Sequence, residues 1–207
     1  MRNEKDSVKN SEGGKNMKAL AINGSPRHDG NTNAMLETVL AELGSEGFDT
    51  GILQLGGKPV QGCTACRACF EMKNGKCILE DDMVNKCISE MSGSDVILLG
   101  SPTYFGDITA EMKALIDRAG YVSKANGDLF SRKIGAAVVP ARRAGSMHGF
   151  DTINHFFFIS DMIVPGSTYW NISLSRDVGD FHTDAEGLKT MKRLAANIAW
   201  LAKKINS

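Results

Sequence analysis

Short apolar runs alternate with helical patterns along most of this chain. From Lys18 onward, five runs that are apolar and partly β-branched predict strands. They are Lys18–Asn23, Thr50–Leu55, Asp95–Gly100, Ile134–Pro140 and a weaker one near Ser167–Ile172. Helical patterns fill most of the intervals between them, so the chain is expected to form an α/β domain with a parallel sheet.

Apolar residues at helical spacing predict amphipathic helices that pack on the faces of this sheet. The clearest stripes are Met35/Leu36/Val39/Leu40/Leu43, Met83/Val84/Cys87/Ile88/Met91, Met112/Leu115/Ile116/Ala119 and Leu188/Met191/Ala195/Ile198/Leu201. Asp117 and Arg118 lie between residues of the third stripe, and we expect both side chains to face solvent. Phe156–Ile159 is an apolar patch on a further predicted helix, typical of core or of a subunit contact.

A length of 207 residues fits one domain with a sizeable core of its own. Residues 1–16 are polar and rich in glycine, which predicts a disordered tail ahead of a domain spanning residues 17–207.

Charge and hydropathy limit the kinds of binding partner and the cellular location that are expected for this protein. Lysine and arginine together number 24, as do aspartate and glutamate, so no overall field attracts nucleic acid or an anionic membrane. The sequence shows neither a membrane-spanning apolar stretch nor the apolar segment of a secretory signal. A cytoplasmic location is therefore expected.

In a parallel sheet, every strand-to-helix loop emerges at the same edge, where ligands bind near the topological switch point. Four unusual loops should meet there: residues 24–33, 56–81, 101–107 and 141–147.

The first of these loops has the composition of a phosphate site. It leads into a helix whose start offers free N–H groups and a positive dipole end to an anion. Ser25, Asn31 and Thr32 add short donors, Arg27 adds a charge, and Gly30 permits close backbone approach. The dinucleotide pattern Gly-x-Gly-x-x-Gly and the Gly-Lys-Ser/Thr ending of a nucleotide triphosphatase are both missing, and a plain polar turn is the alternative.

Three motifs in order make the chain resemble a known family. Ser-Pro-Arg-x-x-Gly-Asn-Thr, the cysteine run and Ser101-Pro102-Thr103-Tyr104-Phe105-Gly106 are together similar to the NADPH-dependent FMN reductase family, and most of all to its iron-sulfur flavoproteins. The resemblance covers roughly residues 17–200. It implies a flavodoxin-like, doubly wound five-stranded parallel sheet of order 2-1-3-4-5, bound FMN, and a homodimer or homotetramer.

Carried over by position, the resemblance assigns two groups of cofactor-binding residues. The FMN phosphate would be held by Ser25, Arg27, Asn31 and Thr32, with Asn33 as a weaker member. The isoalloxazine ring would be lined by Pro102, Thr103, Tyr104, Phe105 and Gly106. Arg142 and Gly145 follow the fourth predicted strand, where a guanidinium could face reduced flavin or a nicotinamide nucleotide, or be a solvated surface group.

Four cysteines lie within fifteen residues: Cys63, Cys66, Cys69 and Cys77. Four thiolates are what a [4Fe-4S] cluster requires, and the resemblance favours one here. Zinc, a redox-active thiol pair, or reduced cysteines in a loop that covers the flavin are the alternatives. Cys87 stands apart, on an apolar helical stripe, and is expected to be a buried core thiol.

Together these features predict an FMN-dependent NAD(P)H oxidoreductase. Hydride would pass from the nicotinamide to the flavin, and the electrons would go on to a small-molecule or protein acceptor. A [4Fe-4S] cluster could carry the electrons from the flavin to that acceptor. No side chain is assigned as catalytic. The alternative is an electron carrier that ferredoxin reduces, without pyridine-nucleotide activity; a colourless zinc-stabilised binding module is a third hypothesis, which the phosphate loop argues against.

Overall fold

The computed structural model describes residues 16–205, and within them five parallel strands form one sheet in the order β2-β1-β3-β4-β5. The strands are β1 Lys18–Asn23, β2 Asp49–Gln54, β3 Val96–Gly100, β4 Ile134–Ala141 and β5 Ile172–Leu174. Pairing runs in register along β1, with Lys18 opposite Asp49 on one side and Ala19 opposite Val96 on the other. The predicted sheet, including its strand order, is confirmed.

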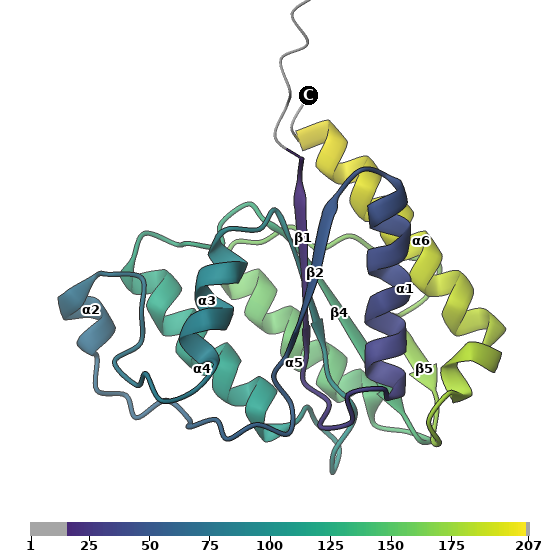
Figure 1. Ribbon diagram of the computed structural model, residues 1–207, viewed down its shortest axis with the longest axis horizontal. Helices are drawn as coiled ribbons and strands as arrows, with labels where there is room; N and C mark the ends of the chain where they lie inside the picture. The colour runs from purple at the N-terminus through teal and green to yellow at the C-terminus, as the bar shows by residue number, and fades with distance from the viewer. Residues whose placement is uncertain (1–15, 206–207) are drawn as a thin grey trace, which may run out of the picture.

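Helices cover both faces of this sheet, which lies between them in Figure 1. Helices α1 (Asn31–Ser45) and α6 (Ala185–Ile205) cover one face, and α3 (Val84–Ser92), α4 (Ala110–Ala125) and α5 (Ser146–Ile159) cover the other. A short 3-10 helix, η1, spans Asp180–Thr183. None of the described helices is both long and apolar enough to cross a membrane.

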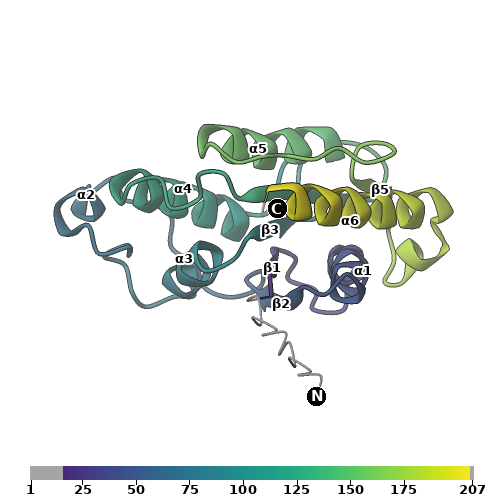
Figure 2. The same ribbon diagram turned by 90° about the horizontal axis from the view of Figure 1, so that it is seen from above.

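The short helix α2 (Ala68–Met72) lies outside these two layers. It packs beside α4 through an edge-on contact of Phe70 with Tyr121, whose ring centroids are 6.2 Å apart. Figure 2 shows α2 beyond α4, at the end of the molecule away from α1 and α6. The cysteine-rich segment that contains α2 is therefore held by α4 and does not extend the sheet.

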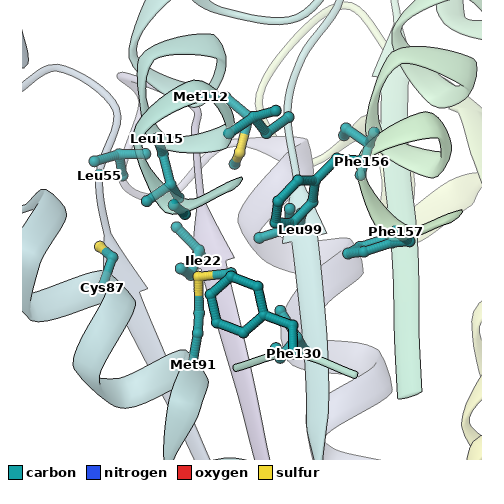
Figure 3. Packing of buried hydrophobic residues seen from close by; sticks show 14 of the residues in the cluster. Ile22, Leu55, Cys87, Met91, Leu99, Met112, Leu115, Phe130, Phe156 and Phe157 are labelled. Atoms are coloured by element: carbon teal, nitrogen blue, oxygen red, sulfur yellow. The ribbon is translucent and has the colours of Figure 1, made fainter. Parts of the chain in front are cut away.

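The core consists of two clusters, one on each side of the sheet. Alternate residues of β3 supply them: Val96 and Leu98 face α1 and α6, whereas Ile97 and Leu99 face the other three helices. Figure 3 shows the second cluster, in which Phe130, Phe156 and Phe157 pack with side chains of the strands and of α4. Since burying one large apolar side chain contributes roughly 1.5–3 kcal/mol, these clusters dominate the stability of the fold.

The predicted boundaries differ most at the last strand. Ser167–Ile172 was predicted, but only Ile172 of that range belongs to β5. The Ser167 hydroxyl donates to the carbonyl of Tyr169 and, at 2.7 Å, to the side chain of Asn171, so this segment turns before the strand begins. The predicted tail, residues 1–16, lies outside the described residues except for Asn16.

Candidate functional site

A pocket of about 410 Å³ opens at the carboxyl edge of the sheet, the lower edge in Figure 1. Three of the four loops predicted to meet at this edge contribute to it. The cysteine-rich loop contributes none of its lining side chains, and the segment after β5 takes its place. The pocket is lined by Ser25, Arg27, Gly30, Asn31, Thr32, Pro102, Thr103, Tyr104, Pro140, Ala141, Arg142, Ser175, Arg176 and Asp177.

The loop between β1 and α1 is shaped by its own hydrogen bonds. The Ser25 N–H donates to the side-chain oxygen of Asn23 at 3.0 Å, and the Arg27 N–H donates to Ser25 Oγ at 3.2 Å. Gly30 stands at the N-cap of α1, where no side chain caps the helix and no acidic residue lies in the first turn. The first N–H groups of a 15-residue helix are thus left without a side-chain cap beside the pocket, as an anion site requires.

Asn31 joins this loop to the segment after β5. Its Nδ2 donates to the Asp177 carbonyl at 2.8 Å, and its Oδ1 accepts from the N–H groups of Gly179 and Phe181, each at 3.2 Å. The Oδ1 of Asn31 and one N–H of its Nδ2 are therefore engaged within the protein, so that the side chain ties the loop of residues 24–33 to the segment after β5. Asn31 also lines the pocket, at the helix N-terminus that it begins.

Asn33 is not part of the pocket lining. It is buried, and its Oδ1 accepts from Asn23 Nδ2 at 3.5 Å. Thr32, in contrast, lies on the pocket wall and is also buried, so it is the better placed of these two neighbours of Asn31.

The loop after β3 forms a wall and a projecting tip. Pro102, Thr103 and Tyr104 line the pocket, and Tyr104 exchanges backbone hydrogen bonds with Asp107. Phe105 and Gly106 form the tip of this turn, where Phe105 is fully exposed and has a positive φ of 48°. Neither residue of the tip lines the pocket of the single chain.

Two arginines complete the pocket, and one of them escaped prediction. Arg142 follows β4 as expected, whereas Gly145 lies beyond the pocket and precedes α5 with a φ of 92°. Arg176 comes from the segment after β5, where its N–H and that of Asp177 donate to the carboxylate of Asp180. These N–H groups lower the pKa of Asp180. A basic residue just after the fifth strand could have pointed to Arg176, but the predicted strand, Ser167–Ile172, ended two residues before the observed one.

All four clustered cysteines line a second pocket of about 270 Å³, separate from the first. Cys63 and Cys66 are exposed, and Cys69 and Cys77 are half-buried. Ala65 and Arg67, between them, adopt left-handed backbone conformations with φ of 54° and 61°. Both residues lie in the segment whose four cysteines line this pocket.

The thiols of this pocket differ in their surroundings. The N–H of Ala68 and the hydroxyl of Thr64 lower the pKa of Cys66, whereas burial raises the pKa of Cys69. Four thiols around one pocket are a donor set that fits an iron-sulfur cluster or zinc. Within residues 16–205, however, no three metal-binding side chains are already gathered around one point.

The expectation that Arg118 faces solvent was wrong. Its side chain has no exposed surface and pairs with Asp82, which is 7% exposed. Burial by itself would raise the pKa of Asp82, but Arg118 and the N–H groups of Val84 and Gln61 outweigh it, and the pKa is lowered. Asp117, in contrast, does form a surface ion pair, with Lys113 at 2.5 Å.

Cys87 is buried among apolar side chains, as predicted (Figure 3). Burial raises its pKa to about 12, so at pH 8 about one thiol in ten thousand is ionised. In iron-free protein at pH 8 we expect iodoacetamide to label Cys63 and Cys66 within minutes and to leave Cys87 unlabelled until the protein is denatured. Mass spectrometry of peptides taken over time would measure this, and labelling of Cys87 at the rate of Cys63 would contradict the buried position.

Comparison with known proteins agrees with the fold. The family described as NADPH-dependent FMN reductase matches residues 17–177. An iron-sulfur flavoprotein of Methanocaldococcus jannaschii is 34% identical over 196 residues, and this match covers 91% of the present chain and 99% of the relative. A second from the same organism is 29% identical over 188 residues, covering 86% and 92%. Among solved structures, an archaeal flavodoxin superposes with a TM-score of 0.60 at 20% identity, covering 90% of this chain and 99% of its own.

Proposed function

Because this chain belongs to the NADPH-dependent FMN reductase family, in the branch of the iron-sulfur flavoproteins, we propose that it is an FMN-dependent NAD(P)H oxidoreductase. Membership makes it an FMN-binding redox protein; the electron donor and the residues that hold each cofactor are part of the proposal. The observation that carries it is the uncapped start of α1 beside a pocket with three arginines at the carboxyl edge of the sheet.

The first pocket would hold FMN in two parts. Ser25, Arg27, Thr32 and the N–H groups at the start of α1 would bind the phosphate, because they combine short donors with a positive charge. Pro102, Thr103 and Tyr104 would lie against the ring system, as in other sites with an apolar wall and a few polar groups.

Bound FMN supplies the chemistry, since it can take up a hydride as two electrons and release them one at a time. The chain's own part is to bind and orient. Arg142 and Arg176 line the same pocket and would stabilise negative charge on reduced flavin or receive a phosphate of the nicotinamide nucleotide. No side chain is required as an acid or base for hydride transfer, and we assign none.

A [4Fe-4S] cluster would be held by Cys63, Cys66, Cys69 and Cys77, which share the second pocket. Bound there, it would supply one-electron transfer to an acceptor. The donor set supports this proposal, as do the curated relatives named iron-sulfur flavoproteins.

An electron carrier that ferredoxin reduces is the second candidate. The cysteine pocket favours it, because Cys63 and Cys66 are exposed and a protein partner could approach the metal directly. Such a carrier would use the same FMN site but no nicotinamide nucleotide.

The test is the absorption spectrum of protein purified without oxygen, together with iron, sulfide and FMN analysis. We expect one FMN and about four irons and four sulfides per chain. Addition of NADH or NADPH in separate cuvettes should bleach the flavin within seconds. Bleaching by reduced ferredoxin but by neither nicotinamide nucleotide would favour the electron carrier over the NAD(P)H oxidoreductase. Protein purified without bound flavin would contradict both proposals.

A homodimer or homotetramer remains part of the proposal. Phe156 and Phe157 are core residues, but Phe158 and Ile159 at the end of α5 are 62% and 71% exposed. Ile159 also lines an apolar groove between α4 and α5. Light scattering after gel filtration would give the mass of the assembly, and a monomer at micromolar concentration would argue against this contact.

A further inference from the structure

Arg118 is a buried cation directed at the cysteine-rich segment, and it does not line the pocket proposed for FMN. Its Nε donates to Cys77 Sγ at 3.3 Å. Its Nη1 donates to the carbonyl of Gln61 at 3.0 Å and to Asp82, and its Nη2 donates to the carbonyl of Leu79 at 2.6 Å. All four acceptors belong to the segment between β2 and α3.

Burying the charge of Arg118 costs free energy, which indicates that its contacts with the cysteine-rich segment have a structural role. A buried guanidinium needs a counter-ion and filled hydrogen bonds, and a surface arginine on α4 would need neither. Asp82 supplies the counter-ion. The two carbonyls, from Gln61 and Leu79, come from opposite ends of a segment whose only helix has five residues. Arg118 therefore links the two ends of the segment to each other and to α4.

Cys77 is the cysteine that this arrangement fixes. Besides the contact of its sulfur with Arg118, its N–H donates to Asn85 Oδ1 at 2.8 Å and its carbonyl accepts from Asn85 Nδ2 at 2.9 Å. Cys63 and Cys66 are exposed, and the backbone N–H of Ala65, which donates to Cys63 Sγ at 3.4 Å, comes from within the same turn. The cysteine pocket thus has one side that α4 and α3 hold in place.

We propose that Arg118 is the positioning residue of the cysteine pocket: it holds Cys77 in place before any metal binds and raises the reduction potential of a cluster bound there. The second part rests on the proposed cluster. One added electron makes a cluster one unit more negative, and a buried cation with an N–H on a ligating sulfur stabilises that reduced form.

Three variants distinguish the positioning of Cys77 by Arg118 from the effect of the Arg118 charge on the cluster. Arg118→Gln with Asp82→Asn removes both charges together, so that no buried carboxylate is left without a partner. Arg118→Lys keeps a cation but loses the fork that reaches both carbonyls. Asp82→Asn alone keeps Arg118 and serves as the matched control.

The first measurement uses iron-free protein, in which hydrogen exchange of peptides from residues 61–82 is followed by mass spectrometry. Exchange should be at least tenfold faster in the double variant and in Arg118→Lys, with peptides of β1 and β3 unchanged as an internal reference. Unchanged exchange in the double variant would overturn the positioning role, whether or not the protein takes up iron.

The second measurement is the cluster potential, from a dithionite titration of reconstituted protein. Compared with Asp82→Asn alone, from which it differs only by the Arg118 charge, the double variant should be harder to reduce, by about 59 mV if the equilibrium shifts tenfold. Arg118→Lys should stay near the parent. Equal potentials in the fully loaded double variant and in Asp82→Asn would overturn the charge effect, while the positioning role would still be judged by the exchange measurement. A parent protein that binds FMN but no iron would instead overturn the proposed cluster, and the charge effect with it.

Discussion

Replacing Gly56 by alanine should both destabilise the protein and weaken FMN binding. A methyl group at this position would overlap the backbone of Gly24 and Ser25, so the phosphate loop would have to move. We expect the free energy of unfolding to fall by about 2–4 kcal/mol, as for other overpacked backbone contacts. The displaced loop should bind FMN about 100-fold less tightly, or about 2.7 kcal/mol. Urea unfolding of the apoprotein and flavin fluorescence titration would measure the two effects.

Gly51→Ala is the matched control. Gly51 lies on the exposed β2 strand, and no atom comes within 4 Å of the position that its Cβ would take. The same chemical change there should leave both FMN affinity and stability close to those of the parent, because a strand tolerates alanine at least as well as glycine. If Gly56→Ala behaved like Gly51→Ala, the close approach of Gly56 to the phosphate loop would be wrong.

The second large effect is expected at Asn31, where aspartate has almost the same shape. Asn31→Asp loses the donor to the Asp177 carbonyl and places a negative charge at the start of α1. If the FMN phosphate binds there, the two changes should weaken FMN binding by about 100-fold. Stability should fall by only about 1–3 kcal/mol, because one partly buried hydrogen bond, that to the Asp177 carbonyl, is lost. Fluorescence titration at fixed salt would give the affinity.

Asn197→Asp controls for the chemistry of this change. Asn197 also donates through Nδ2 to a backbone carbonyl, that of Gly166 at 2.7 Å, but on the surface and away from the pocket. FMN affinity should be unchanged in this variant. Equal affinity of Asn31→Asp and the parent would mean that the phosphate binds elsewhere, and the assignment of this loop would have to be abandoned.

Four of the five strands were predicted to within one residue at each end, including the exposed edge strand β2, predicted as Thr50–Leu55 and found at Asp49–Gln54. β1, β3 and β4 are continuous apolar runs, since helices cover both sides of them, and their predicted ends agree with the structure to within one residue. β5 has only three residues and lies at the edge of the sheet, so little of it is buried. Its apolar signal was therefore too weak to separate it from the preceding turn, and Arg176, just beyond it, was missed for the same reason.

The role of Arg118 could not be predicted from local pattern. A charged residue next to Asp117 on an amphipathic helix is normally solvated, and Asp117 is. What buries Arg118 is a segment 36 to 57 residues earlier in the chain, which folds back over α4. The spacing of the cysteines likewise indicated a common site but not the arginine beside it.

The packing of α6 on α1 has a consequence for how the chain folds as it is synthesised. These helices cover one face of the sheet together, and Met191, Leu194 and Ile198 of α6 complete the cluster that Met35 and Leu36 of α1 begin. Until the 21 residues of α6 have left the ribosome, that face exposes apolar side chains to water. The nascent chain can form β1, β2 and α1 early, but this face is covered only when α6 packs against α1.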